Sequence, residues 1–575
     1  MSTEDSQPAD LVVRGSAVYT LDPARPWAEA LAVRDGKVVV VGDEAEVAAV
    51  TGARTRVVQA EGGMVLPGLI DVHSHVGFGG QAAAWELGLS PAFGVAEILD
   101  AVRQRAGELG PDEWVIGGLV ISPVFHAMGT PEMLAALDEA SQGRPVMLRD
   151  DSLHNRWVNS RALRILGIDA ASKDPAGGSY VRDTASRPVG LLLGQPSTDA
   201  ELAARRSFGD PRERDLRSAR TAVSIFNSMG VTATQDAATM GAWLDVFTEL
   251  DRAGELNAWI VGSMPAREFI ESGPVGTDLF DTAPARRSTH VRPDFVKGIL
   301  DGVPMTRTSK FLDPYKPDPF ASAGAPDAHA CPFHGEGLFS DEELHQLLED
   351  ALSRGLHVKL HATADGTVRQ SLDAVAVMRE RYGAGPVFHI AHPEFVHPDD
   401  VARFAELGVV ADASPVLWFP NPMSGVIAQQ VQDHYMERIW PLRELHDAGS
   451  LVAAGSDWPV AMPVPNPWLS IETMVTRRNP DPSFPGSLAA DQALDLDTAI
   501  RAHTVNAARA MGLGQWTGRL TPGLSADFVV LDRNLFETPI ERIHATQVRQ
   551  TWFAGRLVHD GTTAEGTAAD GTTAN

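Results

Sequence analysis

The sequence is poor in cysteine and in lysine, and these two shortages limit disulfide formation and the number of side chains that can react as amines. Its 575 residues contain one cysteine, Cys331, which excludes an internal disulfide framework and predicts a cytoplasmic location. Only six of its 48 basic residues are lysines, and the other 42 are arginines. Arginine cannot be deprotonated in proteins, so it cannot react as an amine. A lysine at a candidate site is therefore a candidate for amine chemistry.

Long apolar runs and net positive charge are also missing. No stretch approaches the ~18 consecutive apolar residues of a membrane-spanning helix. The acidic first five residues lack the apolar region of a secretory signal. The formal net charge of -27 argues against nucleic acid and membrane as partners, because both need a basic protein surface. A small molecule is therefore the expected partner.

Short apolar runs alternate with helical patterns through the middle of the chain. Helices are predicted for residues 341–354 and 397–407. Strand–helix alternation over ~430 residues fits a parallel sheet, and the closed form of such a sheet is a TIM-like (β/α)8 barrel of the α/β class. The runs of strand type include residues 114–118, 145–150, 230–236, 295–301, 356–361, 387–392, 408–412 and 451–457.

The two ends of the chain have a different texture. Short strand patterns separated by turns occupy residues 9–59 and return in residues 526–558, so both ends are expected to form one small β-sandwich module. The predicted organisation assigns residues 1–64 and 513–560 to this module, residues 65–512 to the barrel, with loop insertions near 170–195 and 310–340, and residues 561–575 to a disordered tail.

Polar residues stand at the ends of several predicted strands. His73 and His75 end the apolar run of residues 65–75, and residues i and i+2 of a strand point to the same face. Two imidazoles side by side are half of a site for zinc or a similar divalent metal. Active sites of such barrels lie at the carboxyl ends of the strands. The corresponding positions of later strands hold Lys297, His361, His392 and Asp457. Because crowded ionisable groups are costly without a compensating cation, a divalent metal centre is predicted.

With these motifs in place, the chain resembles the amidohydrolase superfamily and, within it, the YtcJ-like subgroup that includes N-substituted formamide deformylase. The resemblance implies a hydrolase that cleaves a non-peptide carbon–nitrogen bond, of an N-substituted formamide or related acyl amide, with metal-activated water. It leaves the oligomeric state open, with a homodimer as one alternative. It covers roughly residues 9–560 and is carried by residues 66–75, 296–302, 361–365, 392–400, 455–460, 503–509 and 523–532.

The resemblance also implies a ligand set. His73 and His75 would bind a first metal ion with Asp457 beside it, and His361 and His392 would bind a second. Zinc is the expected metal, because imidazole and carboxylate ligands suit it. The number of ions, one or two, stays open.

The two lysines near this set have alternative interpretations. The resemblance implies that Lys297 is carboxylated and bridges the metals as a carbamate, whereas the residues alone also allow a buried ion pair with Asp301. Lys359 lies two residues before His361 and shares its strand face, either as a rival charged group or as the partner of a carboxylate. Ala391 stands where relatives usually have glutamate, which removes a partner that could orient a metal-bound imidazole.

Two residues are predicted to act on the substrate. Asp457 would be the general base and then the general acid, although residues 455–459 would also suit a helix N-cap. His154 matches a position at which relatives hold the substrate carbonyl, and a structural histidine is the alternative. Two other functions remain open: a deaminase or cyclic-amide or ureide hydrolase on the same scaffold, and a non-catalytic binding barrel.

Overall fold

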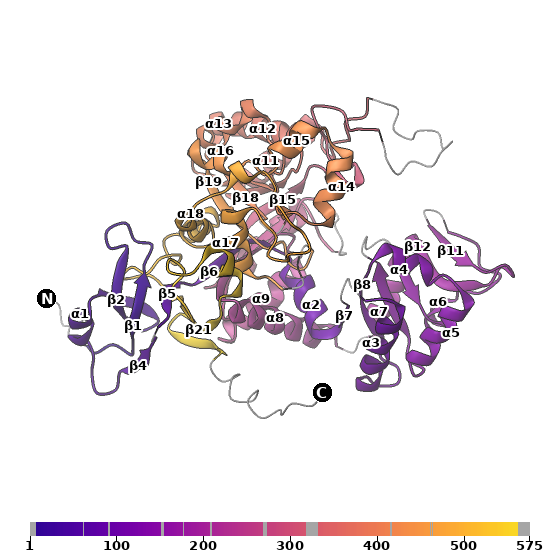
Figure 1. Ribbon diagram of the computed structural model, residues 1–575, viewed down its shortest axis with the longest axis horizontal. Coiled ribbons are helices and arrows are strands. Elements are labelled where there is room, and N and C mark those ends of the chain that lie inside the picture. The colour runs from indigo at the N-terminus through magenta and orange to yellow at the C-terminus, as the bar shows by residue number, and fades with distance from the viewer. Residues whose placement is uncertain are drawn as a thin grey trace. The chain divides into compact units, whose positions relative to one another are not determined.

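The computed structural model describes residues 7–60, 62–89, 93–150, 155–175, 178–207, 210–267, 273–317, 332–414, 417–460, 462 and 464–561 (Figure 1). The chain divides into two compact units. One comprises Met1–Val76 and Val223–Asn575, and the other comprises Gly77–Ala222.

Eight parallel strands form the centre of the first unit. They are neighbours in the order β19-β18-β17-β16-β15-β14-β13-β6, and every adjacent pair is parallel. Ile70, Val261 and Phe295 of these strands are fully buried in one apolar core cluster. The predicted barrel of parallel strands is therefore confirmed. The strands are β6 (Leu69–Ser74), β13 (Val231–Asp236), β14 (Trp259–Pro265), β15 (Val291–Ile299), β16 (His357–His361), β17 (Phe388–Ala391), β18 (Val409–Ala413) and β19 (Leu451–Ala454).

The barrel closes between β6 and the segment that follows β19. Asp457 N donates to His73 O at 2.7 Å, and His75 N donates to Trp458 O at 2.7 Å. Gly455 precedes these contacts, and a Cβ at this position would lie 2.3 Å from the backbone nitrogen of His73. A glycine is therefore required where the two strand ends meet.

Helices follow or precede most of the barrel strands. In α11, Ser340 Oγ accepts a hydrogen bond from Glu343 N while the Glu343 carboxylate accepts one from Ser340 N, which is a capping box. This helix and α13 confirm the helices predicted for residues 341–354 and 397–407. The helices of this unit are α1 (Glu44–Ala48), α9 (Gly241–Arg252), α10 (Thr277–Phe280), α11 (Asp341–Leu352), α12 (Asp365–Tyr382), α13 (Pro398–Glu406), α14 (Pro422–Gln430), α15 (Asp433–Glu437), α16 (Leu442–Asp447), α17 (Pro467–Thr476), α18 (Leu496–Ala502) and α19 (Val505–Ala510), with short 3₁₀ helices at Ala283–Arg286, Pro304–Thr306, Ala490–Gln492 and Ile540–Ala545.

The two ends of the chain meet in a second sheet of the same unit. Strand β20 from the C-terminal part pairs with β5 from the N-terminal part, which joins both ends in one eight-stranded sheet. Phe528, Trp552 and Val65 contribute to its apolar core. The described strands form one connected sheet, so a sandwich of two separate sheets is not confirmed. The strands are β1 (Leu11–Tyr19), β2 (Trp27–Arg34), β3 (Lys37–Gly42), β4 (Arg56–Gln59), β5 (Met64–Pro67), β20 (Phe528–Leu531), β21 (Val548–Phe553) and β22 (Arg556–Asp560).

The second unit corrects one expectation. The apolar runs of residues 114–118 and 145–150 were expected among the barrel strands, but they form β8 and β9 of a separate six-stranded sheet with its own apolar core. The strands of this sheet are β7 (Leu87–Gly88), β8 (Val115–Val120), β9 (Val146–Asp150), β10 (Asn155–Val158), β11 (Gly178–Arg182) and β12 (Pro188–Gly194). The helices of this unit are α3 (Val95–Glu108), α4 (Ser122–Ala127), α5 (Pro131–Ala140), α6 (Ser160–Leu166) and α7 (Gln195–Ser207), while α2 (Val76–Trp85) and α8 (Pro211–Ser228) span the two boundaries of the unit.

Among the described residues, no helix is both long and apolar enough to cross a membrane.

Candidate metal centre

Three buried side chains offer a convergent set of metal donors. His73 is the penultimate residue of β6, His392 directly follows β17, and Asp457 follows β19. One ligand atom from each lies within 4.8 Å of the others. His392 and Asp457 both have left-handed backbone, with φ of 59° and 54°. Non-glycine residues rarely adopt this conformation, and such strain clusters at functional sites, where it directs a side chain.

The other three predicted ligands lie against this triad. His75 Nε2 is 3.3 Å from Asp457 Oδ1, and Lys297 Nζ is 3.3 Å from His73 Nε2. The ring of His361 lies 5.0 Å from that of His392 between centroids. The structure therefore brings all six predicted ligands to the same end of the barrel.

The proton on His361 can be placed from its contacts. Its Nε2 donates a hydrogen bond to the carbonyl oxygen of Gly302 at 3.1 Å, because a carbonyl can only accept. In a neutral imidazole the Nδ1 atom then carries the free lone pair. His392 Nδ1 faces Ser414 Oγ at 3.1 Å, which leaves the Nε2 atom of His392 for a metal.

The alternative pairing of Lys297 with Asp301 does not form. The Asp301 carboxylate instead accepts hydrogen bonds from Thr363 N at 3.0 Å and from Thr367 Oγ1 at 2.6 Å. No ion pair between Asp301 and Lys297 occurs in the described part of the chain. The amine of Lys297 is thus directed toward His73 rather than toward this carboxylate.

Burial keeps the imidazoles of His73 and His392 uncharged. It lowers the pKa of His73 well below its usual value, with the nearby charges of Lys297 and Lys359 adding to the effect. The pKa of His392 falls in the same way, chiefly through burial and the neighbouring His73. Burial and repulsion from Lys359 lower the pKa of Lys297 to about 7. Metals bind neutral imidazole, so these shifts prepare the site for a cation.

Asp457 remains the anionic group of the centre. Burial alone would raise the pKa of its carboxyl, but a hydrogen bond with His75 and the nearby His392 and Lys297 lower it overall. A buried carboxylate among imidazoles supplies negative charge that favours binding of a divalent cation. The donor set therefore fits a divalent metal.

Comparison with known proteins identifies the family. A profile described as "Amidohydrolase family" matches residues 56–559. The chain belongs to the amidohydrolase family. It is 27% identical to an N-substituted formamide deformylase of Arthrobacter pascens, with 97% of this chain and 99% of that protein aligned. It is 25% identical to the putative amidohydrolase YtcJ of Bacillus subtilis, with 95% and 98% aligned. A crystal structure of an uncharacterized metal-dependent hydrolase from Pyrococcus horikoshii has the same fold, with a TM-score of 0.71, 21% identity, and 92% of this chain and 99% of that one covered.

The amidohydrolase centre contains residues that the sequence analysis did not assign to it. Asp71 Oδ1 accepts hydrogen bonds from His73 N at 2.9 Å and Ser456 N at 3.1 Å, and so joins the two strand ends that carry metal donors. Asp412, on β18, lies beside His73 and forms a buried ion pair with Lys359. A carboxylate inside the apolar run of residues 409–413 was the available signal for Asp412. Of the two interpretations of Lys359, the ion pair is the one observed.

Two residues of interest in the sequence lie outside the residues that the structure describes. They are His154, the predicted substrate-side histidine, and Cys331.

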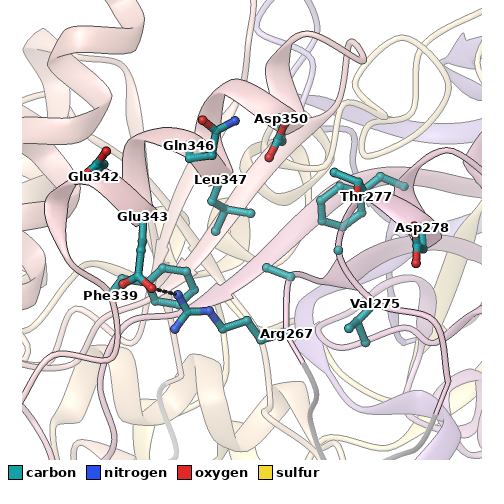
Figure 2. A pocket seen from close by; sticks show the side chains of 13 residues that line it. Arg267, Val275, Thr277, Asp278, Phe339, Glu342, Glu343, Gln346, Leu347 and Asp350 are labelled. Atoms are coloured by element: carbon teal, nitrogen blue, oxygen red, sulfur yellow. Dashed lines mark hydrogen bonds and ion pairs between the residues drawn. The ribbon is translucent and has the colours of Figure 1, made fainter.

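A separate cavity of about 600 Å³ lies beside α10 and α11 (Figure 2). Arg267 donates to Glu343 at 2.8 Å there, and its guanidinium lies 3.6 Å above the ring of Phe339. None of the predicted metal ligands is among its lining residues. This cavity is therefore distinct from the metal centre of the amidohydrolase, and its one arginine is already paired.

Proposed function

We propose that the protein is a metal-dependent hydrolase that cleaves a carbon–nitrogen bond other than a peptide bond, in an N-substituted formamide or a related acyl amide. The observation that carries the proposal is the buried set of His73, His392 and Asp457, whose ligand atoms lie within 4.8 Å of one another. The substrate class is suggested by the likeness to the deformylase over 97% of this chain. We further propose a cytoplasmic location, because the chain has a single cysteine.

Zinc is the proposed metal, as one ion or two. His73 and His75, with Asp457 beside them, would hold a first ion, His361 and His392 would hold a second, and Lys297 would complete the ligand set. When bound, such an ion lowers the pKa of a water molecule toward about 7 and polarises a carbonyl oxygen. The protein's part is to keep these donors buried and correctly oriented.

Lys297 is the proposed carbamate. Its side chain is buried, and burial and the nearby Lys359 lower its pKa to about 7, which favours the neutral amine that carbamate formation needs. The nitrogen lone pair of the neutral amine attacks the carbon of carbon dioxide, a nitrogen–carbon bond forms while one C=O π pair moves onto oxygen, and the nitrogen releases a proton to water. The product is an anion whose two oxygens can each bind a metal. Its location 3.3 Å from His73 Nε2 is consistent with this role.

Asp457 is the proposed general base and acid. Its lowered pKa keeps it ionised, so it can take the proton of the attacking water and pass it to the leaving nitrogen. His154 is the proposed partner of the substrate carbonyl oxygen.

The decisive experiment combines metal analysis with a substrate screen. Protein purified without chelator should contain one or two zinc ions per chain and hydrolyse N-substituted formamides or acyl amides. Ammonia release from an amino-heterocycle, or opening of a cyclic amide or ureide, would favour the deaminase or ureide hydrolase instead. Protein without bound metal and without any of these activities would contradict the proposal and favour a binding barrel.

The role of Asp457 has its own test. We expect Asp457→Asn to retain metal but to lose about 10²- to 10⁴-fold in kcat, which is the usual contribution of a general base. Asp245→Asn, on the exposed side of α9, is the matched control and should retain full activity. Full activity in Asp457→Asn would overturn the assignment.

A further inference from the structure

A buried ion pair lies beside the metal centre and is not part of the predicted ligand set. Asp412 on β18 and Lys359 on β16 are both fully buried and in direct contact. His389 Nδ1 lies 3.3 Å from the same Asp412 Oδ2 atom. Taking two charges out of water costs free energy that is often not recovered, so a buried ion pair is weak evidence for a purely stabilising role.

Lys359 connects this pair to the strand that carries the metal donors. Its Nζ donates a hydrogen bond to the carbonyl oxygen of Val72 at 2.6 Å. Val72 directly precedes His73 on β6, and the second contact of Nζ is the carboxylate of Asp412. One ammonium group therefore holds the backbone next to His73 and the carboxylate beside its ring at the same time.

The ring of His73 lies between Asp412 on one side and Lys297 and Asp457 on the other. Its Nδ1 atom is buried without a hydrogen-bond partner among the described residues, and the nearest carboxylate atom is Asp412 Oδ2 at 3.5 Å. Its Nε2 atom faces Lys297 Nζ at 3.3 Å and Asp457 Oδ1 at 3.7 Å. A carboxylate can only accept hydrogen bonds, so Asp412 favours the proton on Nδ1. The lone pair of Nε2 is then directed at the other metal donors.

We propose that Asp412, held in place by Lys359, is a positioning residue that fixes the tautomer and the ring orientation of His73 for metal binding. The inference rests on the metal site of the proposed function. Partners of this kind typically change metal affinity by about 10- to 100-fold when they are removed.

Two double variants can distinguish a role of Asp412 in positioning His73 from a role in stabilising the fold. Lys359→Met with Asp412→Leu removes both charges and leaves an apolar side chain beside His73, and such replacements of buried ion pairs are commonly tolerated. Lys359→Met with Asp412→Asn also removes both charges but keeps an oxygen that can accept from Nδ1. The second pair is thus the matched control for the first.

The measured quantity is the affinity for Zn²⁺, from competition with a chromophoric chelator, alongside the melting temperature without metal. We expect the leucine pair to bind Zn²⁺ about 10- to 100-fold more weakly than the wild type, and the asparagine pair to recover most of that loss. Unchanged Zn²⁺ affinity in the leucine pair would overturn the positioning role of Asp412 but would not contradict the proposed metal site. A wild-type protein that binds no Zn²⁺ would instead overturn the proposed function.

A second measurement does not depend on either paired substitution folding. In the metal-free wild type with ¹⁵N-labelled histidine, the signals of His73, assigned with His73→Gln, should report a proton on Nδ1 and none on Nε2. The opposite tautomer would overturn the inference.

Discussion

Replacing Gly455 by alanine should test how tightly the barrel closes at the metal centre. An added Cβ would lie 2.3 Å from His73 N, 2.7 Å from Asp71 Oδ1 and 2.8 Å from His73 Cβ. Gly455 cannot retreat freely, because its own N–H donates to Ala413 O at 2.9 Å. The strand end of β6 and the segment after β19 must therefore move apart.

The cost can be worked out from these contacts. Extra methyl groups in a packed interior cost about 1–3 kcal/mol. The upper end applies here because two of the three contacts are with atoms of His73 that belong to or adjoin the backbone. The shift also strains the hydrogen bonds of Asp71 with His73 and Ser456, each worth about 1 kcal/mol. We expect Gly455→Ala to lose about 3 kcal/mol of unfolding free energy.

Gly425 is a control for Gly455, because its replacement by alanine is expected to stabilise the fold rather than to destabilise it. Gly425 lies inside α14, and a Cβ built on it meets no atom within 4 Å. Alanine in a helix interior is about 0.5–1 kcal/mol more favourable than glycine, so Gly425→Ala should be slightly stabilising.

Urea unfolding of both variants, followed by tryptophan fluorescence, measures the two effects. Zn²⁺ titration of the folded variants should add a second difference, because only the first substitution displaces His73. A Gly455→Ala protein that unfolds at the wild-type midpoint and binds Zn²⁺ normally would refute the close packing at this strand end.

Two further expectations concern stability alone. Ser340→Ala should lose about 1 kcal/mol by removing the cap that accepts from Glu343 N, and a urea midpoint equal to that of the wild type would contradict this. Burial lowers the pKa of His503 to about 4, and its neutral ring donates to Ile70 O while Ser470 donates to it. Between pH 6.5 and 4 the unfolded chain therefore binds the extra proton, and stability falls as the pH falls. Between pH 7 and pH 5 the free energy of unfolding from urea titration should fall by up to about 2 kcal/mol more in the wild type than in His503→Gln, and equal changes in the two proteins would exclude this contribution.

Local sequence patterns predicted much of the fold. The apolar runs that became β13, β15, β16 and β18 could be read as strands because each is short, apolar and bounded by turn residues. The cap at Ser340 is also a local signal, since its partner Glu343 is three residues away. The strands β8 and β9 have the same local pattern as barrel strands, and nothing within them specifies which sheet they join.

The sequence by itself determined the residue types at the strand ends, and with them the donors of the candidate metal centre. The i, i+2 spacing of His73 and His75 follows from strand geometry alone, whereas Asp457 lies beyond the end of β19 with left-handed backbone. Only the tertiary structure decided how these side chains are held. Lys359 contacts Asp412 across 53 residues of chain and Val72 across 287, so this network depends on strands brought together by barrel closure. Such contacts do not produce a periodic pattern in the sequence, because they depend on which strands become neighbours and on the distances between side chains in the closed barrel.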